Sequence, residues 1–191
     1  MKNNYPTYNR RDPMEVIDNF LPYTQFSSLQ NAMMDEYFSW HYNDRIVFDD
    51  EEARNDVNDF QFTHTFFAAM GIDPDPMEER MSNDLPIVMP VIDQLGCGKD
   101  DALRIKANLL TRYDTHLPNR FHVDLTDLPY DKCNTAVYYI NTNDGYTEFE
   151  DGTKVESVEN RMVIFDHKIK HRGTRCTDQK ARIVVNFNYY V

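Results

Sequence analysis

The sequence predicts an α+β chain that is mainly β, with a core of short strands that N-terminal helices brace. From about residue 102 the chain is a series of short apolar or alternating stretches separated by turn residues. Before residue 100, two stretches have helical character. Roughly seven or eight short strands with such turns are typical of a β-sandwich or a jelly roll. The length fits one domain, 1–191, in which 1–100 support a core formed by 102–191.

In the first half, residues 16–40 predict a short strand, a turn at Pro22 and then an amphipathic helix. Its apolar stripe is Phe26, Leu29, Met33 and Tyr37. Residues 60–68 alternate as a strand does, and residues 85–96 predict a buried helix that ends near Gly96.

In the second half, turn residues at 143–145, 151–152 and 159–160 separate the apolar or alternating stretches. The expected strands are 102–113, 119–125, 134–142, 146–151, 153–159, 161–166, 170–174 and 181–191.

Charge and cysteine content narrow the class of protein. A net charge of −12 argues against a nucleic-acid or membrane-surface binder, because phosphates would be repelled. The three cysteines are far apart and form no Cys-x-x-Cys pair, which indicates free thiols in a reducing compartment. The first residues lack the apolar segment of a signal peptide, and no apolar run approaches a membrane span. We therefore expect a cytoplasmic protein.

His122 and Asp124 form the most informative short motif, because residues two apart in a strand project to the same face. The pair is either a surface ion pair or two-thirds of a metal site. A second histidine placed opposite would complete two histidines and one carboxylate, the ligand set of non-haem Fe(II) oxygenases, which leaves coordination positions open. His171 is the candidate third ligand because of its spacing to Arg182, and His167 is its rival. We call His122, Asp124 and His171 the triad.

Arg182 lies inside the apolar final strand, 181–191. A buried guanidinium is costly without an anion, and a carboxylate held by two parallel hydrogen bonds is its natural partner. A metal site with an arginine deeper in the barrel therefore predicts a ligand with a chelating head and a carboxylate tail. 2-Oxoglutarate has that shape.

The triad, with Arg182 eleven residues after His171, resembles the 2-oxoglutarate/Fe(II)-dependent oxygenases, specifically their prolyl 4-hydroxylase-like branch. The resemblance is close over 102–191 and only general over 14–100. The small acidic chain also resembles oxygenases of marine phages. The family's fold, a double-stranded β-helix or jelly roll, is what this resemblance implies for the core.

The resemblance also implies roles for single residues. The triad would hold Fe(II) and form the catalytic centre. Arg182 and Tyr139 would bind the distal carboxylate of 2-oxoglutarate, and Tyr113 would point at this cosubstrate. The implied enzyme is a dioxygenase that uses O2, hydroxylates a C–H bond and releases succinate and CO2, with ascorbate as a further candidate cofactor. Both tyrosines have an alternative reading as aromatic packing in the barrel.

The sequence departs from the family at 144–152, where a Gly-Gly-x-Leu-x-Phe stretch is common, so a wall near the substrate is expected to differ. The carboxylate of Asp124 argues against a halogenase. Two other readings stay open. One is a jelly-roll module whose metal is structural or absent, and the other is a cupin-type dioxygenase, which needs no buried arginine.

The prime substrate is the main open question. A prolyl residue in a peptide or protein is the leading candidate, and a free amino acid or small metabolite is the alternative. The N-terminal half and the loops 114–121 and 126–134 are expected to set this choice. By alternation, Thr111, Val137 and Asn186 share faces with site residues, either as site contacts or as barrel lining. The roles of His64, His116, Arg172 and Arg175, and the oligomeric state, stay open.

Overall fold

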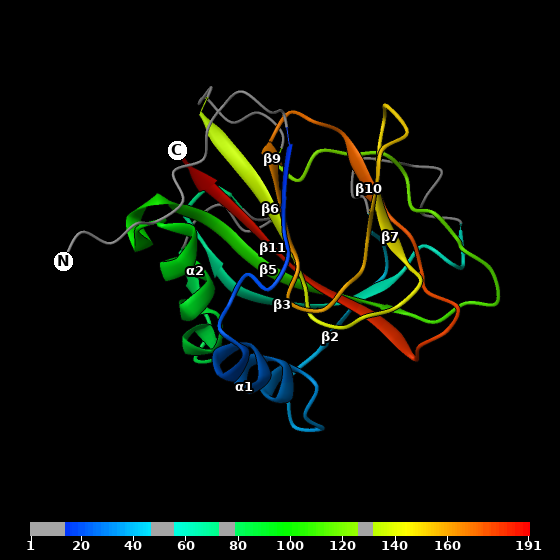
Figure 1. Ribbon diagram of the computed structural model, residues 1–191, viewed down its shortest axis with the longest axis horizontal. Coiled ribbons are helices and arrows are strands. Elements are labelled where there is room, and N and C mark those ends of the chain that lie inside the picture. Colours follow the sequence, from blue (N-terminus) through cyan, green and yellow to red (C-terminus); the bar gives the residue numbers. More distant parts are fainter. Residues whose placement is uncertain (1–13, 47–55, 73–78, 126–131) are drawn as a thin grey trace.

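The computed structural model describes residues 14–46, 56–72, 79–125 and 132–191. Its strands form a large antiparallel sheet and a small one, which confirms the mainly β, jelly-roll prediction (Figure 1). In spatial order the large sheet contains β1 (Met14–Ile17), β9 (Met162–Asp166), β6 (Cys133–Tyr139), β11 (Ala181–Tyr190), β5 (Ala102–Thr111), β3 (Gln61–Ala68) and β2 (His41–Asn43), and β4 (Arg80–Met81) pairs with β3. The small sheet contains β10 (His171–Gly173), β7 (Tyr146–Phe149) and β8 (Lys154–Glu156).

Two α-helices brace the large sheet, as predicted. They are α1 (Tyr23–Met33) and α2 (Met89–Leu95), and two short 3₁₀ turns, η2 (Leu85–Ile87) and η3 (Lys99–Asp101), flank α2. Figure 1 shows α1 and α2 on one side of the molecule and β7 and β10 on the opposite side. Gly96 ends α2 with a φ of 67°, a left-handed conformation that glycine adopts without steric cost. No helix of the described residues is long and apolar enough to cross a bilayer.

Strand alternation divides the interior into two layers. On β11, Ile183, Val185 and Phe187 pack with the buried faces of both helices in the main hydrophobic core. The intervening Val184 belongs to a second cluster, with Tyr139 of β6, on the side of the small sheet. The functional candidates lie in this second layer, so the helices support the site without touching it.

Two helix predictions need correction. The helix α1 ends at Met33, and Tyr37, expected on its buried stripe, is 85% exposed. The chain turns instead at Asp35, whose side chain accepts a hydrogen bond from the backbone N–H of Tyr37 at 2.9 Å. The helix expected over 85–96 is divided into η2 and α2, each with a proline in its first turn, where a missing N–H is tolerated.

The main core gives a direct test of this layering. Replacement of Phe187, which is 2% exposed, by alanine should lower the free energy of unfolding by about 3–5 kcal/mol, because it removes buried surface and leaves a cavity. The measurement is urea denaturation. The control is Tyr23→Ala, at a position 76% exposed, which should change stability by about 0.5 kcal/mol or less. Equal losses in the two variants would contradict the assignment of this layer.

Candidate metal centre

Main-chain pairing brings the two histidines of the triad together. The N–H of His122 donates to the carbonyl of His171, and the N–H of His171 donates back, both at 3.0 Å. The N–H of Asn119 donates to the carbonyl of Gly173 at 2.8 Å, so the segment before His122 lies antiparallel to β10. The prediction of a regular strand over 119–125 is therefore wrong. The segment is reduced to isolated bridges, and the chain bends at Asp124.

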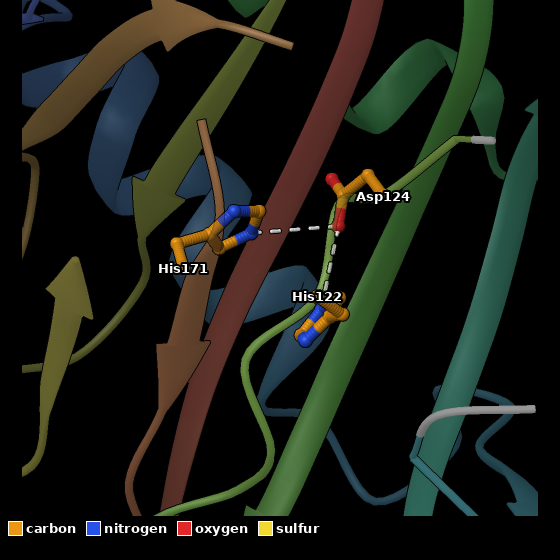
Figure 2. Close-up of side chains that lie close together, drawn as sticks. All are labelled: His122, Asp124 and His171. Carbon is orange, nitrogen blue, oxygen red and sulfur yellow. Dashed lines mark ion pairs between the residues drawn. The ribbon is translucent and has the colours of Figure 1, made fainter. Parts of the chain in front are cut away.

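The triad converges on one point (Figure 2). Asp124 Oδ1 lies 3.7 Å from Nε2 of His122 and 3.5 Å from Nε2 of His171. The Nδ1 atoms face carbonyls two residues earlier, that of Arg120 at 3.0 Å and that of Ile169 at 3.3 Å. Because a carbonyl only accepts, each Nδ1 can donate to its carbonyl, and each Nε2 points towards the centre of the triad.

Burial and neighbouring groups shift the pKa values of His122 and Asp124. Burial, with His171 nearby, lowers the pKa of His122. Burial alone would raise the pKa of Asp124, but the contact with His171 and the charge of Arg104 hold that pKa well below its usual range. A neutral His122 imidazole and an ionised Asp124 carboxylate are the forms that bind metal.

The second oxygen of Asp124 has its own partners. Asp124 Oδ2 accepts hydrogen bonds from the side-chain amides of Asn186, at 3.0 Å, and Asn188, at 3.1 Å. Arg104 Nη2 donates to the backbone carbonyl of Asp124 at 3.1 Å and lies 3.9 Å from Oδ2. The sequence placed Asn186 on the site face, but Asn188 and Arg104 were missed. The signal available for them was the alternation of polar with apolar residues on β5 and β11, which places Arg104 and Asn188 on the site face but does not show their contact with Asp124.

The donor set fits a divalent transition metal with open coordination positions. Two imidazole nitrogens and one carboxylate oxygen lie within 4.8 Å of one another and match the ligand set of non-haem iron. The side chains of His171 and Asp124 are 5% and 4% exposed, whereas that of His122 is 22% exposed. The centre is therefore shielded on one side and reachable on the other.

Arg182 lies in the same layer and is 3% exposed. Its Nε donates to Ser157 Oγ at 2.8 Å, and its Nη2 donates to Thr147 Oγ1 at 2.9 Å. Tyr139 donates its hydroxyl to the same Thr147 oxygen at 2.8 Å. No carboxylate of the described residues pairs with Arg182, and a buried guanidinium without a counter-ion is costly. The four side chains thus suit a bound anion. Thr147 and Ser157 were not anticipated from the sequence.

The two tyrosines differ in position. Tyr139 is fully buried, and the guanidinium of Arg182 lies 5.6 Å from the centre of its ring. Tyr113 is 39% exposed, and its backbone N–H donates to the carbonyl of Cys176 at 3.0 Å. No described contact joins the side chain of Tyr113 to the triad or to Arg182. Its role stays a prediction.

His171, and not its rival His167, joins His122 and Asp124. His167 lies in the turn after β9, and both of its ring nitrogens are buried without a hydrogen-bond partner in the described part of the chain. The structure therefore separates the two histidines that spacing alone left as alternatives.

Two further histidines have structural partners. His64 is buried, and its ring nitrogens contact the carbonyl of Ser39 at 2.8 Å and the hydroxyl of Ser82 at 3.0 Å. Nε2 of His116 lies 3.2 Å from a carboxylate oxygen of Asp144. Neither histidine belongs to the triad.

Arg172 and Arg175, whose roles the sequence leaves open, are both engaged within the protein. Arg172 pairs with Glu148 at 2.7 Å and lies over the ring of Phe121, next to His122. Arg175 is 1% exposed and donates to backbone carbonyls. These are the carbonyls of Thr111, Asn58 and Phe60. Both arginines tie segments together. Of the predicted substrate loops, residues 126–131 lie outside the described residues.

No family model and no curated protein matches this sequence. Solved structures do match. A prolyl hydroxylase from Trichoplax adhaerens, in complex with a peptide of the hypoxia inducible factor oxygen degradation domain, matches with a TM-score of 0.62 and 13% identity over 94% of this chain and 84% of that one. The viral collagen prolyl hydroxylase of Paramecium Bursaria Chlorella virus-1 matches with a TM-score of 0.54 and 15% identity over 95% and 97%.

A third match carries a different activity. A non-haem α-ketoglutarate-dependent epimerase of nogalamycin biosynthesis has a TM-score of 0.58 and 10% identity over 95% of this chain and 77% of that one. At such identities the similarity concerns the fold. The chain has the fold of prolyl hydroxylases and other 2-oxoglutarate/Fe(II) oxygenases, as the resemblance of residues 102–191 implied.

Metal binding to the triad should be visible as thermal stabilisation. A ligand that binds only the folded state at 100 times its dissociation constant adds about 2.7 kcal/mol, so Mn(II) should raise the Tm of the wild type. Asp124→Ala should lose this shift, whereas the control His167→Ala should keep it. The measurement is the Tm of each variant with and without the metal. An equal metal-induced shift in Asp124→Ala would contradict the assignment.

Proposed function

We propose that the protein is a 2-oxoglutarate- and Fe(II)-dependent dioxygenase that hydroxylates a C–H bond. One observation carries the proposal. A two-histidine, one-carboxylate centre shares one layer of the fold with a buried arginine that has no carboxylate partner among the described residues. The strand β11 connects the metal centre with the buried arginine. It presents Arg182 and Asn186 on the same face, and Asn186 contacts Asp124. The fold of the structures compared supports the proposal.

Each part of the site has a defined task. The triad would hold Fe(II), which when bound supplies the oxidising chemistry that consumes O2 and 2-oxoglutarate and releases succinate and CO2. Arg182 would bind the distal carboxylate, with Thr147 and Tyr139 completing its surroundings. Apolar side chains of the second cluster, including Val184, would exclude water between the two positions.

The leading prime substrate is a prolyl residue in a peptide or protein. Its support is the prolyl 4-hydroxylase-like resemblance of the triad and Arg182, together with two compared structures that are prolyl hydroxylases. One of those proteins holds a peptide.

A free amino acid or another polar metabolite is the second candidate, favoured by the chemistry of β5. Arg104, Lys106 and Asn108 alternate with Ile105 and Ala107, which pack in the main core. In register, Lys106 lies beside Asn186 and Asn108 beside Val184, both on the site face of β11. The sheet wall near the metal centre is thus polar, which complements a polar ligand better than an apolar ring.

The test of the proposed function is succinate formation with Fe(II), 2-oxoglutarate, ascorbate and air. We expect formation in the wild type, its loss in Asp124→Ala and its increase with the true prime substrate. Proline-containing peptides and a set of free amino acids are compared, and the product is identified by a mass increase of one oxygen. Equal succinate formation in Asp124→Ala would refute the proposal.

A separate prediction concerns the anion site, which is formed by Arg182, Tyr139, Thr147 and Ser157. Arg182→Met should weaken 2-oxoglutarate binding to the Mn(II)-loaded protein by about 2–5 kcal/mol, the cost of removing one partner of a desolvated charge pair. The measurement is isothermal titration calorimetry. The matched control is Arg112→Met, at a position where the side chain is 57% exposed, which should leave the affinity unchanged. Wild-type affinity in Arg182→Met would contradict the assignment of Arg182 as the partner of the distal carboxylate.

A further inference from the structure

The two carboxylate oxygens of Asp124 have different surroundings. Oδ1 faces the Nε2 atoms of His122 and His171, at 3.7 and 3.5 Å. Oδ2 faces away from them and accepts two amide hydrogen bonds, from Asn186 at 3.0 Å and Asn188 at 3.1 Å. The protein thus distinguishes two oxygens that are chemically equivalent in a free carboxylate.

The orientation of the two amides follows from their partner. An ionised carboxylate has only acceptors, so both asparagines must turn their NH2 groups towards Oδ2. Their carbonyl oxygens are then buried, and neither has a hydrogen-bond partner in the described part of the chain. Buried acceptors without partners lower stability. Such a departure from full hydrogen bonding is expected at functional sites.

The asparagines belong to a rigid element, whereas Asp124 does not. Both lie on β11, which pairs with β5 on one side and with β6 on the other. Asn188 is 1% exposed, and its amide also donates to Thr135 of β6 at 3.1 Å. Asp124 lies at a bend, outside regular pairing. The central sheet therefore supplies the hydrogen bonds to Oδ2 of a carboxylate whose own segment is irregular, and Arg104 of β5 adds a charge 3.9 Å from the same oxygen.

We propose that Asn186 and Asn188 are positioning residues that hold Oδ2 of Asp124, so that only Oδ1 is offered to the metal. A carboxylate bound through one oxygen uses one coordination position, and the two imidazoles use one each. The remaining positions then stay open for the cosubstrate and O2. If Oδ2 were free, the carboxylate could bind through both oxygens and occupy a position that the cosubstrate needs. The inference rests on the proposed function in one respect, the presence of a metal on the triad.

The test is the titration of Co(II) into the metal-free protein. Binding is monitored by calorimetry and by the visible absorption of the metal. The variants are Asn186→Leu, Asn188→Leu and the double substitution, which keep the side-chain volume and remove the donors. Removal of the hydrogen-bond partners of a metal ligand typically weakens metal binding 10–100-fold. We expect a decrease in Co(II) affinity of this size, together with an altered Co(II) absorption spectrum. A structural role alone would lower the Tm of the metal-free protein without changing the spectrum.

The matched control is Asn108→Leu, the same substitution on the same face of the neighbouring strand β5, beside Val184 and without a described contact to Asp124. It should keep wild-type affinity and spectrum. If the double variant does not fold, Asn186→Leu decides, because Asn186 is the less buried of the two. Unchanged affinity and spectrum in the folded variants would overturn the inference alone. A wild type that binds no Co(II) would overturn both the inference and the proposed function.

Discussion

The site depends on the reciprocal pair of backbone hydrogen bonds between His122 and His171. These bonds, each 3.0 Å long, attach an irregular segment to β10, and they place two imidazoles from distant parts of the chain side by side. Each ring is then oriented by a carbonyl two residues earlier in its own segment. Main-chain groups therefore contribute to both the separation and the orientation of the rings, and the ring of Phe165 packs edge-on against that of His171, with the ring centroids 4.8 Å apart.

The strand β11 connects this centre to the rest of the molecule. One of its faces packs on the helices through Ile183, Val185 and Phe187, and the other presents the buried Arg182 and the asparagines that contact Asp124. Stability and the proposed chemistry therefore share one element. Polar groups at the centre of a sheet are costly unless they are paired, and here the pairing is made with the candidate metal ligand and the anion site.

Residue types and spacing were sufficient for much of the fold. Turn residues and alternation located most of the strands, and the distance from His171 to Arg182 pointed to the histidine that lies beside His122 and Asp124. Asn188, Thr147 and Ser157 were missed because their contacts depend on strand register and on pairing between sheets, which the sequence does not show. Residues 119–125 were predicted as a strand because local alternation cannot reveal that only isolated pairs form.

The central claim is that the metal centre and the anion site bind one molecule together. Its most direct test is an anaerobic titration of 2-oxoglutarate into Fe(II)-loaded protein, monitored by visible absorption. The account predicts a weak metal-to-ligand charge-transfer band that saturates at one 2-oxoglutarate per protein in the wild type and is absent in Asp124→Ala. Iron-loaded wild-type protein that develops no such band would contradict the account.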